Sequence, residues 1–224
     1  MEVFQKLQLW LDPVARPGPE AMAVDEWLLE NAVVPLLRVY QWDRDWASVG
    51  YFGKISEARQ AISQVQWVRR WTGGGMVDHR ADWTYTLVIP QGQKVAAVRG
   101  GESYHWIHSA LAEALRSEGV AAHLSDGHGE TGAAFCFENP VSHDLIGVDG
   151  RKLAGAGQRR TRHGLLHQGS AAIACGPGES LERAKKMAEI LSDSWEQCDF
   201  VIDLAAISEK TTARYGNERW LESR

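Results

Sequence analysis

The chain has 224 residues and a net charge of −5, with 24 Lys and Arg against 29 Asp and Glu. This acidic balance argues against a nucleic-acid-binding protein, which usually carries a basic domain or stripe. No apolar run approaches the roughly 20 residues that a membrane-spanning helix needs, and we see no signal peptide at the N-terminus. The three cysteines form neither a disulfide framework nor a zinc ribbon, so we expect a cytoplasmic protein with free thiols.

Apolar periodicity and turn residues divide the chain into a mixture of helices and strands. The predicted elements, in chain order, are a helix over 20–30, strands over 36–42, 65–71 and 83–89, a helix over 104–115, strands over 144–148 and 151–154 around an Asp149-Gly150 turn, a strand over 165–174, and a helix with Ser180 as its N-cap.

This mixture shows no regular alternation of strand and helix along the chain. It therefore favours an α+β fold with a mixed, mostly antiparallel sheet flanked by helices. The segment after Asp199 is short, and we expect residues 1–224 to form a single domain without a separate C-terminal accessory domain.

Two patterns are weak indications of function. The stretch Gly127–Gly132 reads G-x-G-x-x-G, but the aromatic residues and proline that follow it are poor material for the helix of a dinucleotide site. The spacings of His143, His163 and His167 match no zinc pattern, so we expect no metal.

A glycine run is the first stretch that suggests a binding site. Gly73, Gly74 and Gly75 follow a predicted strand, and three glycines allow close approach of the backbone to a ligand. Their N–H groups could form an anion-binding nest, with Arg70 just before them and His79 just after. The alternative is a loose turn with solvated arginines, which an isolated glycine run would favour. The flanking strands, arginine and histidine favour a binding loop.

The second informative stretch contains Cys136 and Lys152. A lone cysteine is most often inert core filler, and we assign Cys175 and Cys198 that role. A nearby lysine can promote the thiolate, which is the reactive form of cysteine. Small residues over 154–157 would let a ligand approach the strand that carries Lys152. A solvated lysine at a strand edge is the alternative.

Three arginines, Arg159, Arg160 and Arg162, form a basic cluster on this acidic chain. They are either a solvated strand end or a docking patch that steers an acidic protein partner.

Together these stretches resemble the lipoate–octanoate transferase and ligase family, which is related to the biotin-protein ligases. The resemblance runs in collinear order from about Gly18 to about Ala174. It implies the family fold, with the glycine loop and the lysine strand lining one acyl pocket. The matching segments are AMAVDEWLL (21–29), LRVYQW (37–42), VGYFG (49–53), RRWTGGGMVDHRADWTYTL (69–87), DLIGVDGRKLAGAGQRR (144–160) and LLHQGS (165–170).

Two chemistries occur in this family, and the resemblance favours one of them. Cysteine-type octanoyltransferases carry a CF-x-x-P-S segment before the lysine hairpin, and here Cys136-Phe137 begins a similar segment that is one residue longer before the serine. Gly75 at the third loop position is similar to the ATP-dependent ligases instead. The order His167-Gln168 is inverted relative to the usual motif.

The resemblance thus implies octanoyl transfer from acyl carrier protein to the lysine of a lipoyl-domain protein, such as the glycine-cleavage H protein, without a cofactor. Cys136 would be the nucleophile and Lys152 the proton shuttle. Because the sequence has no long exposed apolar run, we expect a monomer. The alternatives are a lipoate ligase that uses ATP and magnesium, and a non-catalytic binder of the acylated partner. For the apolar tunnel we expect walls from Trp71, Met76, Val77 and Tyr85. The predicted substrate-binding residues are Arg70, Gly73, Gly74, Gly75, His79, Tyr85, Gly155, Ala156, Gln158, His167 and Gly169.

Overall fold

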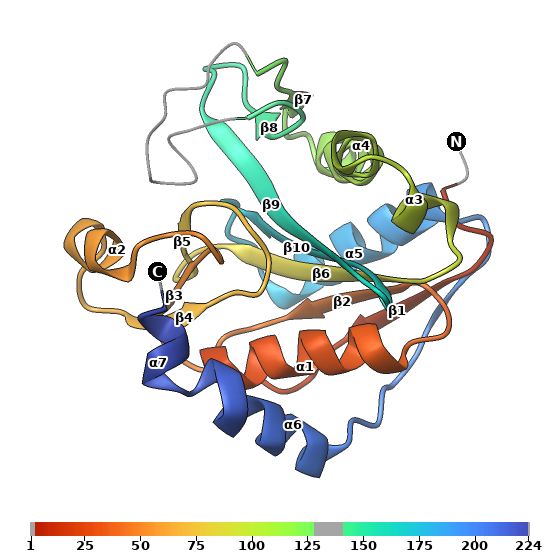
Figure 1. The fold of residues 1–224 in the computed structure, drawn as a ribbon. Helices are drawn as coiled ribbons and strands as arrows, with labels where there is room; N and C mark the ends of the chain where they lie inside the picture. Colours follow the sequence, from red (N-terminus) through yellow and green to blue (C-terminus); the bar gives the residue numbers. More distant parts are fainter. Residues whose placement is uncertain (1–2, 128–140, 224) are drawn as a thin grey trace.

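The structure, a computed structural model, describes residues 3–127 and 141–223 (Figure 1). Within these residues every helix is too short or too polar to traverse a lipid bilayer. The elements, in chain order, are β1 (Leu7–Leu11), α1 (Gly18–Asn31), β2 (Leu36–Tyr40), β3 (Trp46–Val49), α2 (Ile55–Ala61), β4 (Gln66–Arg69), β5 (Met76–Asp78), β6 (Trp83–Pro90), α3 (Lys94–Ala97), α4 (Gly100–Ser117), β7 (His123–Leu124), β8 (Leu145–Ile146), β9 (Lys152–Thr161), β10 (Gly164–Ala171), α5 (Pro177–Leu191), β11 (Trp195–Gln197), α6 (Leu204–Lys210), the π-helical turn η2 (Thr211–Tyr215) and α7 (Glu218–Leu221).

The strands form two sheets. The large sheet has the order β11-β1-β2-β6-β10-β9-β8-β7, and the small one has the order β4-β3-β5. In the large sheet β1 runs parallel to both β11 and β2, whereas all the pairings from β2 to β7 are antiparallel. The predicted fold class, a mixed and mostly antiparallel sheet flanked by helices, is confirmed.

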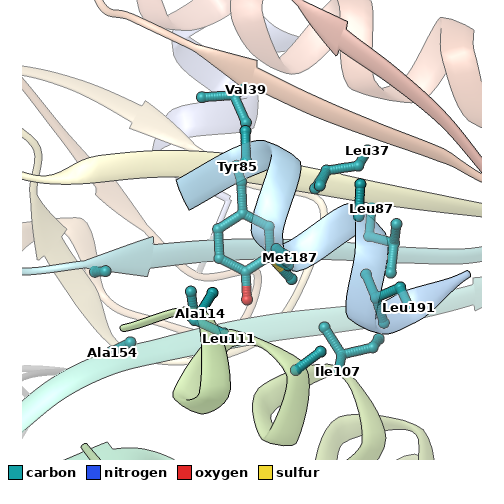
Figure 2. Close-up of a cluster of buried hydrophobic side chains, with 14 of the residues drawn as sticks. Leu37, Val39, Tyr85, Leu87, Ile107, Leu111, Ala114, Ala154, Met187 and Leu191 are labelled. Carbon is teal, nitrogen blue, oxygen red and sulfur yellow. The ribbon is translucent and has the colours of Figure 1, made fainter. Parts of the chain in front are cut away.

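Helices cover both faces of the large sheet (Figure 1). Helices α4 and α5 pack on one face, and α1 with α6 packs on the other. Side chains alternate along β6, so that Tyr85 and Leu87 join the cluster beneath α4 and α5 while Val88 joins the cluster beneath α1. Figure 2 shows Tyr85 extending from β6 toward Leu111 and Ala114 of α4. Burial of each large apolar side chain contributes about 1.5–3 kcal/mol, which fixes the helices on the sheet.

The hairpin from β8 to β9 places Lys152 at the first residue of β9, opposite Ile146. Its predicted turn at Asp149-Gly150 is present, with Gly150 at a φ of +76° and the Asp149 carboxylate accepting a hydrogen bond from the Arg151 amide. Strand β9 then continues without a break to Thr161, although its small residues suggested an earlier end. The ten-residue strand therefore carries both Lys152 and the small residues that follow it.

The start of α5 differs from the prediction. The helix begins at Pro177, whose fixed φ suits a first helical turn, and Gly176 takes the N-cap position. The Glu179 side chain accepts a hydrogen bond from the Gly176 amide at 2.8 Å. Ser180 therefore lies inside the helix, where its hydroxyl accepts a hydrogen bond from Trp83 Nε1 at 2.9 Å and ties α5 to β6.

Candidate active site

A cavity lies between the large sheet and the small sheet. Its space outside protein atoms is about 350 Å³, a volume that includes the open mouth. Strands β9 and β10 form one wall, and the small sheet with the segment after β5 forms the other. The lining residues are Met22, Tyr40, Trp42, Arg70, Val77, His79, Thr84, Gly155, Ala156, Gly157, Gln168, Gly169 and Ser170.

The predicted glycine loop, residues 73–75, lies directly beside this cavity. A Cβ added at Gly157 of β9 would lie only 2.4 Å from the carbonyl oxygen of Gly73, and one added at Gly50 would lie 2.0 Å from that of Gly74. Gly74 also has a φ of +94°, which favours glycine. The loop reaches β9 only because both neighbouring positions lack a side chain. The structure therefore places the glycine loop and the lysine strand side by side.

Arg70 holds the glycine loop from behind. Its guanidinium donates to the carbonyl oxygens of Gly73 and Gly75 at 3.2 and 3.0 Å, and to Ser48 Oγ at 2.5 Å. These two carbonyl groups therefore turn toward the arginine. Because the Arg70 guanidinium bonds these loop carbonyls, Arg70 would support an anion site by holding the loop backbone in place.

His79 continues this network. Its Nε2 lies 2.7 Å from Ser48 Oγ, and its Nδ1 lies 2.7 Å from Asp82 Oδ2. The spacing is that of a Ser-His-Asp triad, but Ser48 is fully buried and accepts a hydrogen bond from Arg70. Trp42 stacks on the imidazole at 4.2 Å between ring centroids. The arrangement fixes His79 in the cavity wall and anchors Arg70.

Arg69 has a different task from its neighbour. Its guanidinium donates to the carbonyl oxygens of Trp220 and Leu221 at the end of α7 and to that of Gly53. Trp220 Nε1 in turn donates to the Arg69 carbonyl at 3.0 Å. The last helix is thus fastened to the end of β4, just ahead of the glycine loop.

Lys152 lies at the cavity end of β9 in a buried ion pair. Its Nζ is 2.6 Å from Asp144 Oδ2, and the side chains are 3% and 0% exposed. A Cβ at Gly155 would lie 2.6 Å from this nitrogen, so the missing side chain leaves the space that the ammonium occupies. Buried charges are stable in proteins only when they are paired and hydrogen-bonded. A paired ammonium against Gly155, which lines the cavity, is a typical arrangement for proton transfer or for stabilising a developing negative charge.

Three predicted substrate-binding residues lie on the opposite face of the sheet, because alternate side chains of a strand point to opposite sides. Tyr85 hydrogen-bonds His167 Nε2 at 3.1 Å, and His167 Nδ1 contacts Gln158 Nε2 at 3.0 Å, all beneath α4. Burial lowers the pKa of His167 well below its ordinary value and raises that of Tyr85. Both side chains are therefore neutral near pH 7, and the structure does not bring them to the cavity.

The predicted tunnel walls are divided in the same way. Val77 lines the cavity, whereas Tyr85 faces α4. Met76 packs in the core of the small sheet. Trp71 lies beneath the guanidinium of Arg159, with 4.4 Å from that group to the ring centroid. The sequence could not separate Met76 from Val77 without knowing which face of β5 meets the large sheet.

The three arginines of the predicted docking patch do not form one surface. Arg159 stacks on Trp71 on the cavity side of β9, while Arg160 donates to the Val98 carbonyl and to Ser103 Oγ near the start of α4. Arg162 is exposed at the hairpin end. The alternation of a long strand separates Arg159 from Arg160, so the three arginines do not form the single cluster that the sequence suggested.

The structure describes two of the three cysteines. Cys175 and Cys198 are half-buried, and burial raises the pKa of both thiols, which agrees with their assignment as packing residues. Cys136, the predicted nucleophile, lies outside the described residues, as does most of the G-x-G-x-x-G stretch. Lys152 is the member of the predicted catalytic pair that the structure describes.

Sequence reasoning missed two residues beside Lys152. Asp144 begins the segment that carries the family resemblance, and a carboxylate eight residues before a lysine across a hairpin turn was a usable signal. Tyr104 hydrogen-bonds Asp144 from α4, forty residues away, and no local pattern indicates that contact.

A family model and several named relatives match this chain. The family model described as the lipoyl protein ligase A/B catalytic domain matches residues 17–208. The chain belongs to this family. The octanoyltransferase LipM of Carboxydothermus hydrogenoformans is 34% identical to this lipoyl protein ligase A/B domain over 178 residues, which cover 75% of this chain and 66% of the relative. The LipM octanoyltransferase of Symbiobacterium thermophilum is 34% identical over 177 residues, covering 71% and 63%. The chain spans about three-fifths of the length of these curated relatives.

Solved structures share the fold of this lipoyl protein ligase A/B domain. A bipartite lipoate protein ligase from Thermoplasma acidophilum superposes with a TM-score of 0.70 at 17% identity, covering 96% of both chains. Lipoate-protein ligase A bound with ATP gives a TM-score of 0.68 at 20% identity, covering 98% of both chains. At these identities the match establishes the architecture of the domain, and the chemistry has to be argued from the site.

Proposed function

We propose that this protein is an octanoyltransferase of lipoate biosynthesis, which moves an octanoyl group from acyl carrier protein to the lysine of a lipoyl-domain protein. The observation that carries the proposal is the buried pair of Lys152 and Asp144 beside a cavity lined by Gly155 and Ala156. Membership of the family, and relatives named as octanoyltransferases, support it. The glycine-cleavage H protein is a suitable acceptor, and a monomer located in the cytoplasm belongs to the same proposal.

In the first half-reaction the thiolate of Cys136 attacks the carbonyl carbon of the carrier thioester. The bond to the carrier sulfur breaks, and the Lys152 ammonium supplies the proton that the carrier thiol takes up. In the second half-reaction the acceptor amine attacks the acyl-cysteine. Its proton passes to Lys152, and Cys136 leaves as thiolate, which regenerates the starting charges.

The oxyanion of each tetrahedral intermediate needs preorganised donors. The Ala156 amide already donates to the Tyr104 hydroxyl at 2.8 Å. We therefore assign this role to amides of the glycine loop, residues 73–75, which adjoins β9. The octanoyl chain itself would lie in the cavity against Met22, Trp42 and Val77.

One observation supports an ATP-dependent ligase as a second candidate. The third loop position is Gly75, as in the family's ligases, and not the arginine that transferases often carry. In that reaction ATP with magnesium would activate free lipoate or octanoate, and Lys152 would contact the acyl-adenylate. Cys136 would then be dispensable.

A transfer assay separates these candidates and the non-catalytic binder. The protein is incubated with a lipoyl domain and either octanoyl-acyl carrier protein without ATP, or octanoate with ATP and magnesium, and the acceptor is weighed by mass spectrometry. We expect acylated acceptor in the first mixture and none with Cys136→Ser, which should still fold. Product in the second mixture alone would establish the ligase, and wild-type rates from Cys136→Ser would refute the thioester route.

A further inference from the structure

Tyr104 lies beside β9, next to the point where the short strand β8 ends. Strand β8 pairs with β9 only through Ile146 opposite Lys152 and Leu145 opposite Ala154. The next amide on this side, that of Ala156, lies beyond the pairing with β8 in the described part of the chain. The Tyr104 hydroxyl accepts its hydrogen at 2.8 Å, so the side chain is registered against the strand that carries Lys152.

The same hydroxyl donates to Asp144. Its distance to Asp144 Oδ1 is 2.5 Å, while Oδ2 of the same carboxylate accepts from the Val141 amide at 2.8 Å and pairs with Lys152 Nζ at 2.6 Å. One carboxylate oxygen is thus set by Tyr104 and the other receives the ammonium. Beside the ion pair with Lys152, Tyr104 also ties the orientation of Asp144 to β9, because its hydroxyl bonds both the carboxylate and the Ala156 amide.

The backbone that leads into Asp144 is held from the same helix. His108 Nδ1 lies 2.7 Å from the carbonyl oxygen of His143, whose φ is +70°. The Tyr104 and His108 rings pack at 4.1 Å between centroids. A pair of neighbouring side chains on α4 therefore fixes both the main chain and the carboxylate of the residue that holds Lys152.

We infer that Tyr104 is a positioning residue for acyl transfer, acting on Lys152 through Asp144. This inference rests on the proposed function, in which Lys152 moves the proton in each half-reaction. Without the hydroxyl, the carboxylate can rotate and the ammonium follows it. Misplacement of a catalytic group by about 1 Å can cost about 100-fold in rate. Since Tyr104 itself does not line the cavity, binding of the acyl donor should be little changed.

The test compares Tyr104→Phe with Tyr215→Phe. Both remove one hydroxyl bonded to a carboxylate, because the Tyr215 hydroxyl donates to Glu26 Oε2 at 2.6 Å on the far side of the domain. With octanoyl-acyl carrier protein as the donor, we expect kcat to fall about 10- to 100-fold in Tyr104→Phe, with KM nearly unchanged. Tyr215→Phe should retain the wild-type kcat. In an Asp144→Asn background, Tyr104→Phe should cause no further loss, because its route to Lys152 is already broken.

A second readout does not depend on turnover. Trace acetylation of Lys152 by acetic anhydride at one fixed pH is followed by peptide mass spectrometry, and its rate should change in Tyr104→Phe but not in Tyr215→Phe. An unchanged acetylation rate would overturn the inference, as would a wild-type kcat or losses that multiply in the Asp144→Asn background. If the wild-type protein transfers no octanoate, the proposed function fails and the acetylation rate alone decides the inference. If Tyr104→Phe does not fold, difluorotyrosine at position 104 gives the same decision, an unchanged rate again overturning the inference.

Discussion

Replacing Gly157 with alanine tests whether close contact between the glycine loop and β9 is built into this domain. The new Cβ would lie 2.4 Å from the carbonyl oxygen of Gly73 and 2.8 Å from Thr72 Oγ1. Ordinary contacts begin near 3.4 Å, so the loop backbone has to move by about 1 Å. Because Thr72 Oγ1 donates to Gln168 Oε1 at 2.7 Å, that buried hydrogen bond is stretched or lost.

The expected cost combines two effects. Overpacking of a well-packed site costs about 1–3 kcal/mol, and loss of a hydrogen bond costs about 1 kcal/mol. The free energy of unfolding should therefore fall by about 2–4 kcal/mol, which lowers the Tm by about 4–16 °C at this chain length.

Urea denaturation and calorimetry of Gly157→Ala measure this loss. The matched control is Gly178→Ala in the first turn of α5, where an added Cβ meets nothing within 4 Å. The control should be neutral or slightly stabilising, because alanine is the better helix former. Acyl loading should fall in Gly157→Ala and not in the control. A Gly157→Ala protein with wild-type stability and loading would refute the reasoning about the loop.

Two further predictions concern the buried charges. Burial lowers the pKa of His108 to about 4, below its value of 6.5 in the unfolded chain. Between these two values the unfolded state binds more protons, so the free energy of unfolding falls as the pH is lowered. From pH 7 to pH 5 this histidine should lower the free energy of unfolding by about 2 kcal/mol. Urea titrations of His108→Gln should show a correspondingly smaller loss, and an identical pH dependence would contradict the burial argument. Lys152→Ala leaves the buried Asp144 carboxylate without its ammonium partner and should lower the free energy of unfolding by about 3–5 kcal/mol. In the same titration, Lys152→Ala combined with Asp144→Asn should recover part of this loss. No recovery would mean that the broken ion pair does not cause the loss.

The local parts of the fold follow from the sequence. The strand at 83–89 and the Asp149-Gly150 hairpin were predicted because alternation and turn chemistry depend on neighbouring residues. Ser180 was wrongly chosen as an N-cap because Pro177 and Gly176 compete for the same helix start. Strand β9 was predicted only in part, since Gly155 and Gly157 weaken a strand locally and are explained only by Lys152 and the glycine loop above them.

The sequence predicted which segments form the candidate site, but not which face of each strand points into it. The glycine loop and Lys152 were found because their motifs are local, and the structure packs them against Gly157 and Gly155, which line one cavity. Tyr85 and His167 lie away from that cavity because their side chains are on the face of the large sheet that α4 covers. Packing between distant elements decides which face of each strand that is. Tyr104 was missed for the same reason, because its contact with Asp144 joins a helix to a distant hairpin.

The most direct test of the proposed thioester route is the intact mass of the protein after incubation with octanoyl-acyl carrier protein in the absence of ATP. The account predicts a single octanoyl adduct that hydroxylamine removes and that Cys136→Ala does not form. An unmodified protein in this mixture, together with acyl-adenylate from octanoate, ATP and magnesium, would contradict it and establish a ligase.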